Sequence, residues 1–287
     1  AIFAMVFGST FGSFNAANAG DITQSNTLIT AYAADADIVT FNNAAATTTM
    51  ANDDTFASGL TTNGTDTTWG ITGGKSLTIT GVLAGTQTSA TTINLSTTGT
   101  SLIVGEAWTK GAASTISINL AAGTDVEVTG DDTHVWAIAG TAQNQGTLIV
   151  TEDAVFTPNI GGTNKDLAAI TVATGKTFQS TGTVRATTFT SGAGVQTFKK
   201  GVATTNMNVT GSTLTFDQVA TAANSGDITE VSGTTIMNVI STDGAAATVS
   251  TFTGAVTIDT VNIGSAAKSG SAVITGSLEV ISGSISS

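Results

Sequence analysis

From about residue 70 onward, the sequence repeats one short pattern, in which apolar side chains at every second position are followed by a turn. A period of two is that of a strand with one buried face, and the glycine, asparagine, aspartate or threonine that follows favours a tight turn. No segment keeps an apolar stripe at the 3.6-residue period of a helix. The sequence therefore predicts an all-β fold. The alternating pairs are Leu77 and Ile79, Ile93 and Leu95, Ile116 and Ile118, Val126 and Val128, Leu148 and Val150, Ile170 and Val172, Leu214 and Phe216, Val256 and Ile258, and Leu278 and Val280.

Two copies of one octet, G-K-[ST]-[LF]-x-x-T-G, occupy residues 74–81 and 175–182. Degenerate repetition with turns of unequal length is typical of stacked coils, because each coil of a solenoid contacts only its neighbours. We therefore expect a β-solenoid, a β-helix-like rod with about 20 residues in each rung. One or two β-sandwich domains are the alternative, because short alternating strands suit that architecture too.

The composition narrows the classes of partner. Charged residues make up 10% of the chain, Pro158 is the only proline, and the mean hydropathy of +0.28 argues against intrinsic disorder. The net charge is −12 with eight lysines and arginines, which argues against nucleic acid and against anionic membrane surfaces. The absence of cysteine excludes thiol catalysis, cysteine metal sites and disulfides. Copies of the chain itself, sugars and cations remain as partners.

Residues 1–19 differ from the rest, since they hold four of the twelve phenylalanines. Their apolar run is too short for a transmembrane span. Residues 17–19, Ala-Asn-Ala, have the form of a signal-peptidase site, so the segment is either a leader remnant that indicates export or a retained connector. A retained phenylalanine stripe would dock on a neighbouring subunit, by adding a strand to a sheet edge or by filling a groove. The predicted interface residues are Ile2, Phe3, Met5, Val6, Phe7, Phe11 and Phe14.

The sequence divides into three parts. Residues 1–19 form the apolar N-terminal segment, residues 20–72 an irregular cap or subdomain, and residues 73–287 the repetitive β body. Residues 20–72 are set apart because they are more polar and carry only short apolar runs, such as Ile38-Val39.

Three stretches resemble a known family. GITGGKSLTITGVLAG (70–85), VATGKTFQSTGTVRATTFTSGAG (172–194) and FTGAVTIDTVNIG (252–264) are similar to the β-helical passengers of bacterial autotransporters, particularly rickettsial-type outer surface antigens. The resemblance implies export, a right-handed β-helix and a role in adhesion or surface coating. Members of that family end in a membrane-embedded barrel, whereas this sequence ends in the polar residues SGSISS.

Few residues suggest chemistry. Acidic pairs recur in turns, and Asp131 with Asp132 is the candidate Ca²⁺ site, because hard cations bind carboxylate and carbonyl oxygens. His134 is the only histidine, and its place beside this pair predicts a turn residue with solvated neighbours. The Gly-Lys-Ser at 74–76 and the Gly-Lys-Thr at 175–177 lack the earlier glycine of a phosphate-binding loop. We predict no catalytic residues, no enzymatic activity, and no cofactor apart from this candidate Ca²⁺.

These observations favour a bacterial structural protein that assembles outside the cell. We expect a secreted subunit of an extracellular filament or a surface layer such as an S-layer, joined to other copies through residues 1–19. A monomeric adhesin or autotransporter passenger that binds a host or a glycan is the alternative. A polysaccharide-acting β-helix enzyme is the less favoured third reading, because no aromatic and acidic cluster stands out.

Overall fold

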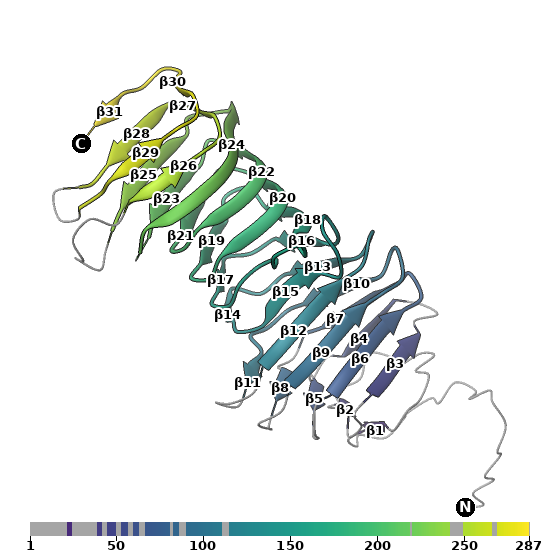
Figure 1. The fold of residues 1–287 in the computed structure, drawn as a ribbon. Helices are drawn as coiled ribbons and strands as arrows, with labels where there is room; N and C mark the ends of the chain where they lie inside the picture. The colour runs from purple at the N-terminus through teal and green to yellow at the C-terminus, as the bar shows by residue number, and fades with distance from the viewer. Residues whose placement is uncertain are drawn as a thin grey trace, which may run out of the picture.

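The computed structural model describes residues 22–24, 39–41, 45–49, 53–56, 60–62, 67–80, 83–85, 90–110, 115–218, 220–241, 249–265 and 269–286. The described residues form strands and no helix, and they therefore include no helix that could cross a membrane. The strands stack into an elongated β-solenoid (Figure 1). The all-β prediction and the solenoid prediction are confirmed.

The chain passes through three strand positions in a repeating order, which we call faces B, A and C. Face A consists of β4 (Asp54–Phe56), β7 (Ser76–Ile79), β10 (Ser101–Val104), β13 (Asp125–Val128), β16 (Thr147–Val150), β18 (Leu167–Val172), the later parts of β20 (Val184–Ser191), β22 (Val202–Thr210) and β24 (Ala222–Ser232), β27 (Val256–Ile258) and β30 (Leu278–Val280).

Face B precedes face A in each coil. It consists of β3 (Ala45–Thr49), β6 (Thr67–Thr72), β9 (Ala90–Leu95), β12 (Thr115–Leu120), β15 (Ala137–Gly140), the first residues of β20, β22 and β24, β26 (Ser250–Phe252) and β29 (Ala272–Ile274). Between β15 and β20, face B is carried by single bridges from Ile138 to Ile160 and from Ile160 to Val184.

Face C follows face A and is made of two separate sheets. The first holds β1 (Ile22–Gln24), β2 (Val39–Phe41), β5 (Leu60–Thr62), β8 (Leu83–Gly85) and β11 (Thr109–Lys110). The second holds β14 (Asp132–His134), β17 (Ala154–Phe156), β19 (Thr177–Ser180), β21 (Val195–Phe198), β23 (Thr213–Asp217), β25 (Ile236–Ile240), β28 (Thr260–Ile263) and β31 (Ile285–Ser286). No strand pairing in the described part of the chain joins β11 to β14.

Named strands pair in parallel with the strand one coil away, which excludes the β-sandwich alternative, because a sandwich is built from antiparallel sheets. The register preserves the alternation seen in the sequence. Leu77 pairs with Leu102, and Leu102 pairs with Val126, and all three side chains are buried. Phe189 and its partner Met207 are 18 positions apart in the sequence (207 − 189), whereas Ile228 and its partner Val256 are 28 positions apart (256 − 228). The coils therefore vary in length.

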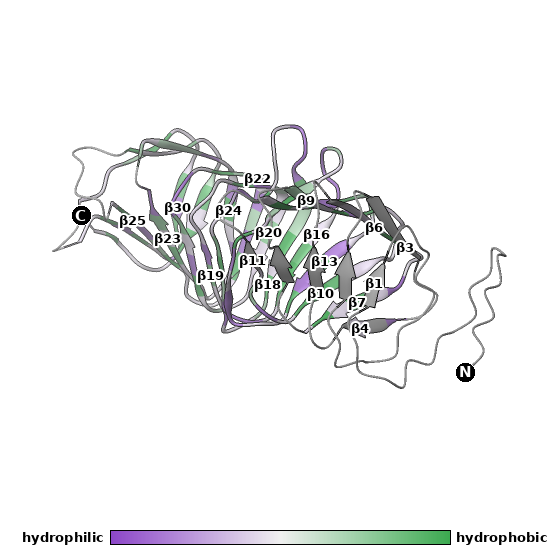
Figure 2. Cartoon of the chain, turned by 90° about the horizontal axis from the view of Figure 1, so that it is seen from below, coloured by the Kyte–Doolittle hydropathy of each residue, from purple (hydrophilic) through white to green (hydrophobic). Residues whose placement is uncertain are grey.

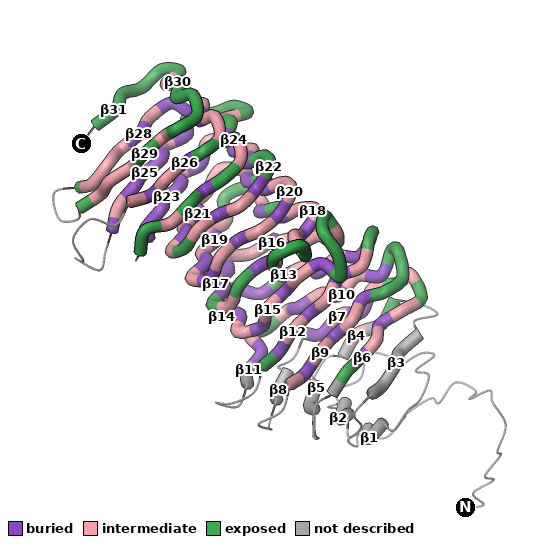
Figure 3. Tube along the Cα trace, viewed as in Figure 1, coloured by how far each residue is buried: buried purple, intermediate pink, exposed green. Residues whose placement is uncertain are grey.

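Apolar side chains from all three faces meet along the axis of the solenoid. Figure 3 shows buried and partly exposed residues alternating along the strands, and Figure 2 shows hydrophobic and hydrophilic residues alternating in the same way. A row of aromatic rings runs through this core, with neighbouring ring centres 4.9–6.0 Å apart, through Trp108, Trp136, Phe156, Phe178, Phe189, Phe198, Phe216 and Phe252. Ring pairs at such distances stabilise a core beyond the area that they bury.

Candidate functional site

The predicted subunit interface lies outside the described residues. It comprises Ile2, Phe3, Met5, Val6, Phe7, Phe11 and Phe14. Their role stays a prediction that rests on the sequence.

The candidate Ca²⁺ residues lie at the corner between faces A and C. Asp131 is exposed in a bend, and Asp132 begins β14 and is half-buried. Lys176 lies near them and donates a hydrogen bond to Glu152. That bond raises the pKa of the Lys176 ammonium, and the charges of Asp153 and Asp131 raise it further. In the described part of the chain, no three or more acidic, histidine or cysteine side chains form a group that could hold a metal. The Ca²⁺ site at Asp131 and Asp132 stays a prediction.

Other acidic turn residues have a structural role that the sequence does not reveal. The carboxylate of Asp153 accepts a hydrogen bond of 2.7 Å from the backbone N–H of Thr177, in the next coil. Two more aspartates accept backbone N–H bonds of 2.8 Å from the following coil, Asp53 from Ser76 and Asp227 from Ala255. These carboxylates therefore clamp one coil to the next where the chain turns a corner.

His134 is not the turn residue that the sequence predicts, because it lies in strand β14. Its side chain is fully buried at the end of β14, with ring centres 5.3 Å from Trp136 and 4.9 Å from Phe156. Burial lowers the pKa of the imidazole to about 4, although the charge of Asp132 raises it in part. The prediction is wrong because β14 begins at Asp132, so that strand alternation turns His134 inward.

Three buried rings at the break in face C have polar atoms without hydrogen-bond partners. These atoms are both ring nitrogens of His134 and the indole N–H groups of Trp108 and Trp136. The ring centres of Trp108 and Trp136 are 5.6 Å apart. A buried donor without a partner costs about 1–3 kcal/mol, so this is a local weak point in the core.

A buried polar network at the corner between faces C and B contrasts with these unpaired atoms. The amide of Gln218 donates 2.8 Å to Asn224, and Ser250 donates 2.7 Å to Gln218. Gln218 also donates 3.1 Å to the carbonyl of Lys200, and Asn224 accepts 3.1 Å from the N–H of Val202. The bonds link adjacent coils, and sequence reasoning missed them because Gln218 and Asn224 occupy a segment without a repeat pattern.

Glu230 and Asp259 form a second acidic contact between coils. The N–H of Asp259 donates 3.1 Å to Glu230, and the Asp259 carboxylate accepts bonds from the Thr235 N–H and the Ser282 hydroxyl. Loss of solvent and the nearby Asp259 raise the pKa of Glu230, whereas the Ser282 hydrogen bond holds the pKa of Asp259 low. Both oxygens of Asp259 are bound to donors from the protein, which makes this residue a link between coils.

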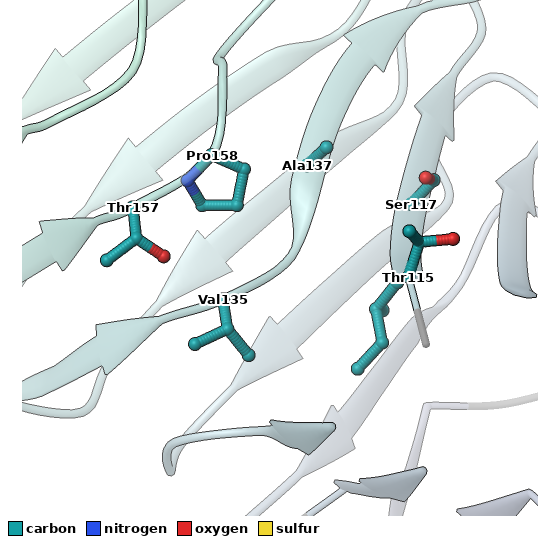
Figure 4. Close-up of a pocket in the computed structure, with 7 residues that line it drawn as sticks. Thr115, Ser117, Val135, Ala137, Thr157 and Pro158 are labelled. Carbon is teal, nitrogen blue, oxygen red and sulfur yellow. The ribbon is translucent and has the colours of Figure 1, made fainter. Parts of the chain in front are cut away.

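Two shallow grooves on the surface are lined by described residues. The first, of about 280 Å³, is lined by Thr115, Ile116, Ser117, Val135, Ala137, Thr157 and Pro158, most of which Figure 4 labels. None of these side chains is titratable, so the groove offers no acid, base or nucleophile beyond hydroxyl groups. The second, of about 300 Å³, contains Lys199 and Lys200 among small residues.

Comparison with family models, curated proteins and solved structures finds no match to this chain. The resemblance to rickettsial-type outer surface antigens therefore remains an expectation from the sequence. What is shown is the coarser statement that the chain is a β-helical protein, a β-solenoid of parallel strands.

Proposed function

We propose that this chain is a secreted structural subunit that assembles with copies of itself into an extracellular filament or a surface layer, with residues 1–19 as the connector. The proposal needs a rod-shaped body and an apolar connector. The β-solenoid supplies the body, and the phenylalanine-rich segment is the candidate connector.

The observation that carries the proposal is the stacking of parallel strands into an elongated solenoid (Figure 1). A rod of this kind can be joined to other rods when an apolar segment adds a strand to a sheet edge or fills a groove.

Removing the connector tests the proposal. Electron microscopy of the full chain should show ordered fibres or lattices, whereas a chain without residues 1–19 should give soluble, folded monomers. A full-length variant with Phe3, Phe7 and Phe11 replaced by serine keeps the length of the segment and should also stay monomeric. Circular dichroism with a strand spectrum serves as the control for folding.

Three results would contradict the proposal. Assemblies that persist after the deletion would remove the role of the connector. A full chain that stays monomeric and binds glycans on an array would support the adhesin alternative instead. Release of reducing sugar from a polysaccharide, abolished by one carboxylate substitution, would support an enzyme.

A further inference from the structure

The outward side of face C differs in charge from that of face A. From β17 to β31, the strands of face C contain one charged residue, Asp217, which is 5% exposed. The strands of face A over the same coils carry the carboxylates Asp227, Glu230 and Glu279. In a chain with a net charge of −12, face C is therefore a side on which two copies can approach without repulsion between like charges.

Two rows of uncharged side chains cover this part of face C. One row runs through Gln179, Thr197, Thr215, Asn238, Asn262 and Ser286, which pair in register across adjacent strands. The Asn262 amide donates 2.9 Å to Asn238, and the Ser286 hydroxyl donates 2.6 Å to Asn262. The other row runs through Thr177, Val195, Thr213, Ile236 and Thr260, and Val195 is 43% exposed. The bonds between Asn238, Asn262 and Ser286 hold these side chains in fixed positions, and rows of side chains in register suit sheet-to-sheet packing.

We propose that face C, from β17 to β31, is a lateral contact surface for face C of a second copy of this chain. The proposal rests on the proposed function, because it adds a side-to-side contact to the end-to-end contact made by residues 1–19. A filament needs only the end-to-end contact. A surface layer or a bundle needs both.

The size of the surface indicates when the contact forms. Seven strands, about 4.8 Å apart, span about 29 Å, and four residues per strand span about 13 Å. Two such surfaces together cover about 800 Å², whereas a stable interface between two proteins buries about 1,200–2,000 Å². One pair of copies is therefore held weakly. Copies already linked end to end make many such contacts at once, and the lateral contact then becomes effective.

The decisive variant places charge on face C. Thr197 and Thr215 are paired neighbours whose side chains point outward, and T197E/T215E adds two carboxylates to each copy. The matched control is T171E/T190E, which makes the same change at paired, outward threonines of face A. We expect bundles or layers from the wild-type chain and from T171E/T190E, and filaments of single width from T197E/T215E.

A crosslinking measurement supplies a second readout. The chain has no cysteine, so T215C introduces the only thiol, on the central strand of the seven. When two faces C pack together, the two Thr215 positions face each other, and a short bis-maleimide should link T215C chains into dimers within assemblies. The control T190C on face A should give at least several-fold less dimer.

The outcomes separate this inference from the proposed function. Wild-type filaments that never associate sideways, bundles that persist in T197E/T215E, or equal crosslinking of T215C and T190C would each overturn the lateral contact and leave the filament standing. A wild-type chain that forms no polymer would overturn both proposals.

Discussion

Single buried polar residues distinguish this solenoid from a uniformly apolar rod. The corner network of Gln218, Asn224 and Ser250 satisfies its polar atoms across coils, whereas His134 lies in the aromatic row with neither nitrogen bonded. A neutral imidazole ring can pack against the aromatic rings of this row. Its protonated form would be a buried cation among Trp136 and Phe156, which is costly.

His134 should therefore make the fold sensitive to mild acid. Its pKa is lowered from 6.5 to about 4 in the folded chain, so the unfolded chain takes up the proton first as pH falls. The contribution of the neutral His134 to the free energy of unfolding is therefore fully present above pH 6.5 and is lost progressively between pH 6.5 and 4. At pH 5 the loss should be about 2 kcal/mol, since a tenfold difference in proton affinity between the folded and unfolded chain corresponds to about 1.4 kcal/mol.

The variant H134F isolates this effect from the titration of the carboxylates. Phenylalanine suits the position, because His134 pairs with Phe156 in the next coil. Urea unfolding at pH 7 and pH 5 should show the free energy of unfolding falling by about 2 kcal/mol more in wild type than in H134F. Equal decreases in the two proteins would show that the imidazole does not set the acid sensitivity.

At the scale of strands, the alternating pattern in the sequence predicts most of the core. Leu77, Ile93 and Leu148 are fully buried, as their patterns predict. Leu278 fits the same pattern but is 37% exposed, in the last coil that the structure describes. A sequence pattern marks which side of a strand faces the core, whereas the degree of burial depends on the coils that pack against that strand.

The long strands show a second feature that the pattern hides. In β20 and β22 the alternation slips, so that two consecutive side chains face outward, Thr187 and Thr188 in β20 and Thr205 and Asn206 in β22. The slip occurs where each strand passes from face B to face A. A phase slip in period-two alternation therefore marks a corner inside a strand, whereas glycine and aspartate mark corners between strands.

Corner aspartates contribute to stability by bonding one coil to the next. D153A removes the acceptor of the Thr177 N–H and should lower the free energy of unfolding by about 1–2 kcal/mol, as expected for a charge-assisted hydrogen bond that is partly exposed. D153N keeps a side-chain oxygen and should lose less than half as much. The exposed Asp131 is the matched control, and D131A should change stability by no more than about 0.5 kcal/mol. Equal losses in D153A and D131A, measured by urea unfolding, would contradict the clamp.

Across the whole molecule, the described strands pair with strands of the neighbouring coils, so stability should vary along the rod. Solenoids behave as linear arrays, in which damage to one coil weakens nearby coils more than distant ones. Face C is broken between β11 and β14, and face B is reduced to single bridges around Ile160. Face A alone continues as named strands through this region. The coils before and after it should therefore unfold with only partial cooperativity.

The positions of the tryptophans allow this to be measured without labels. Trp69, Trp108 and Trp136 all lie in the first half of the chain, so their fluorescence reports on the coils before or at the break in face C. Circular dichroism reports on all strands.

F198A removes a fully buried ring that stacks on Phe216, with ring centres 5.4 Å apart, and should cost about 3–4 kcal/mol in the later coils. The unfolding midpoint measured by circular dichroism should fall, and the unfolding midpoint measured by tryptophan fluorescence should move by less than a third as much. L102A, which opens a cavity at a fully buried position before the break, is the control and should shift the fluorescence midpoint at least as much as the dichroism midpoint. If F198A shifts both midpoints equally, the rod unfolds as one unit, and the break in face C does not separate its two parts.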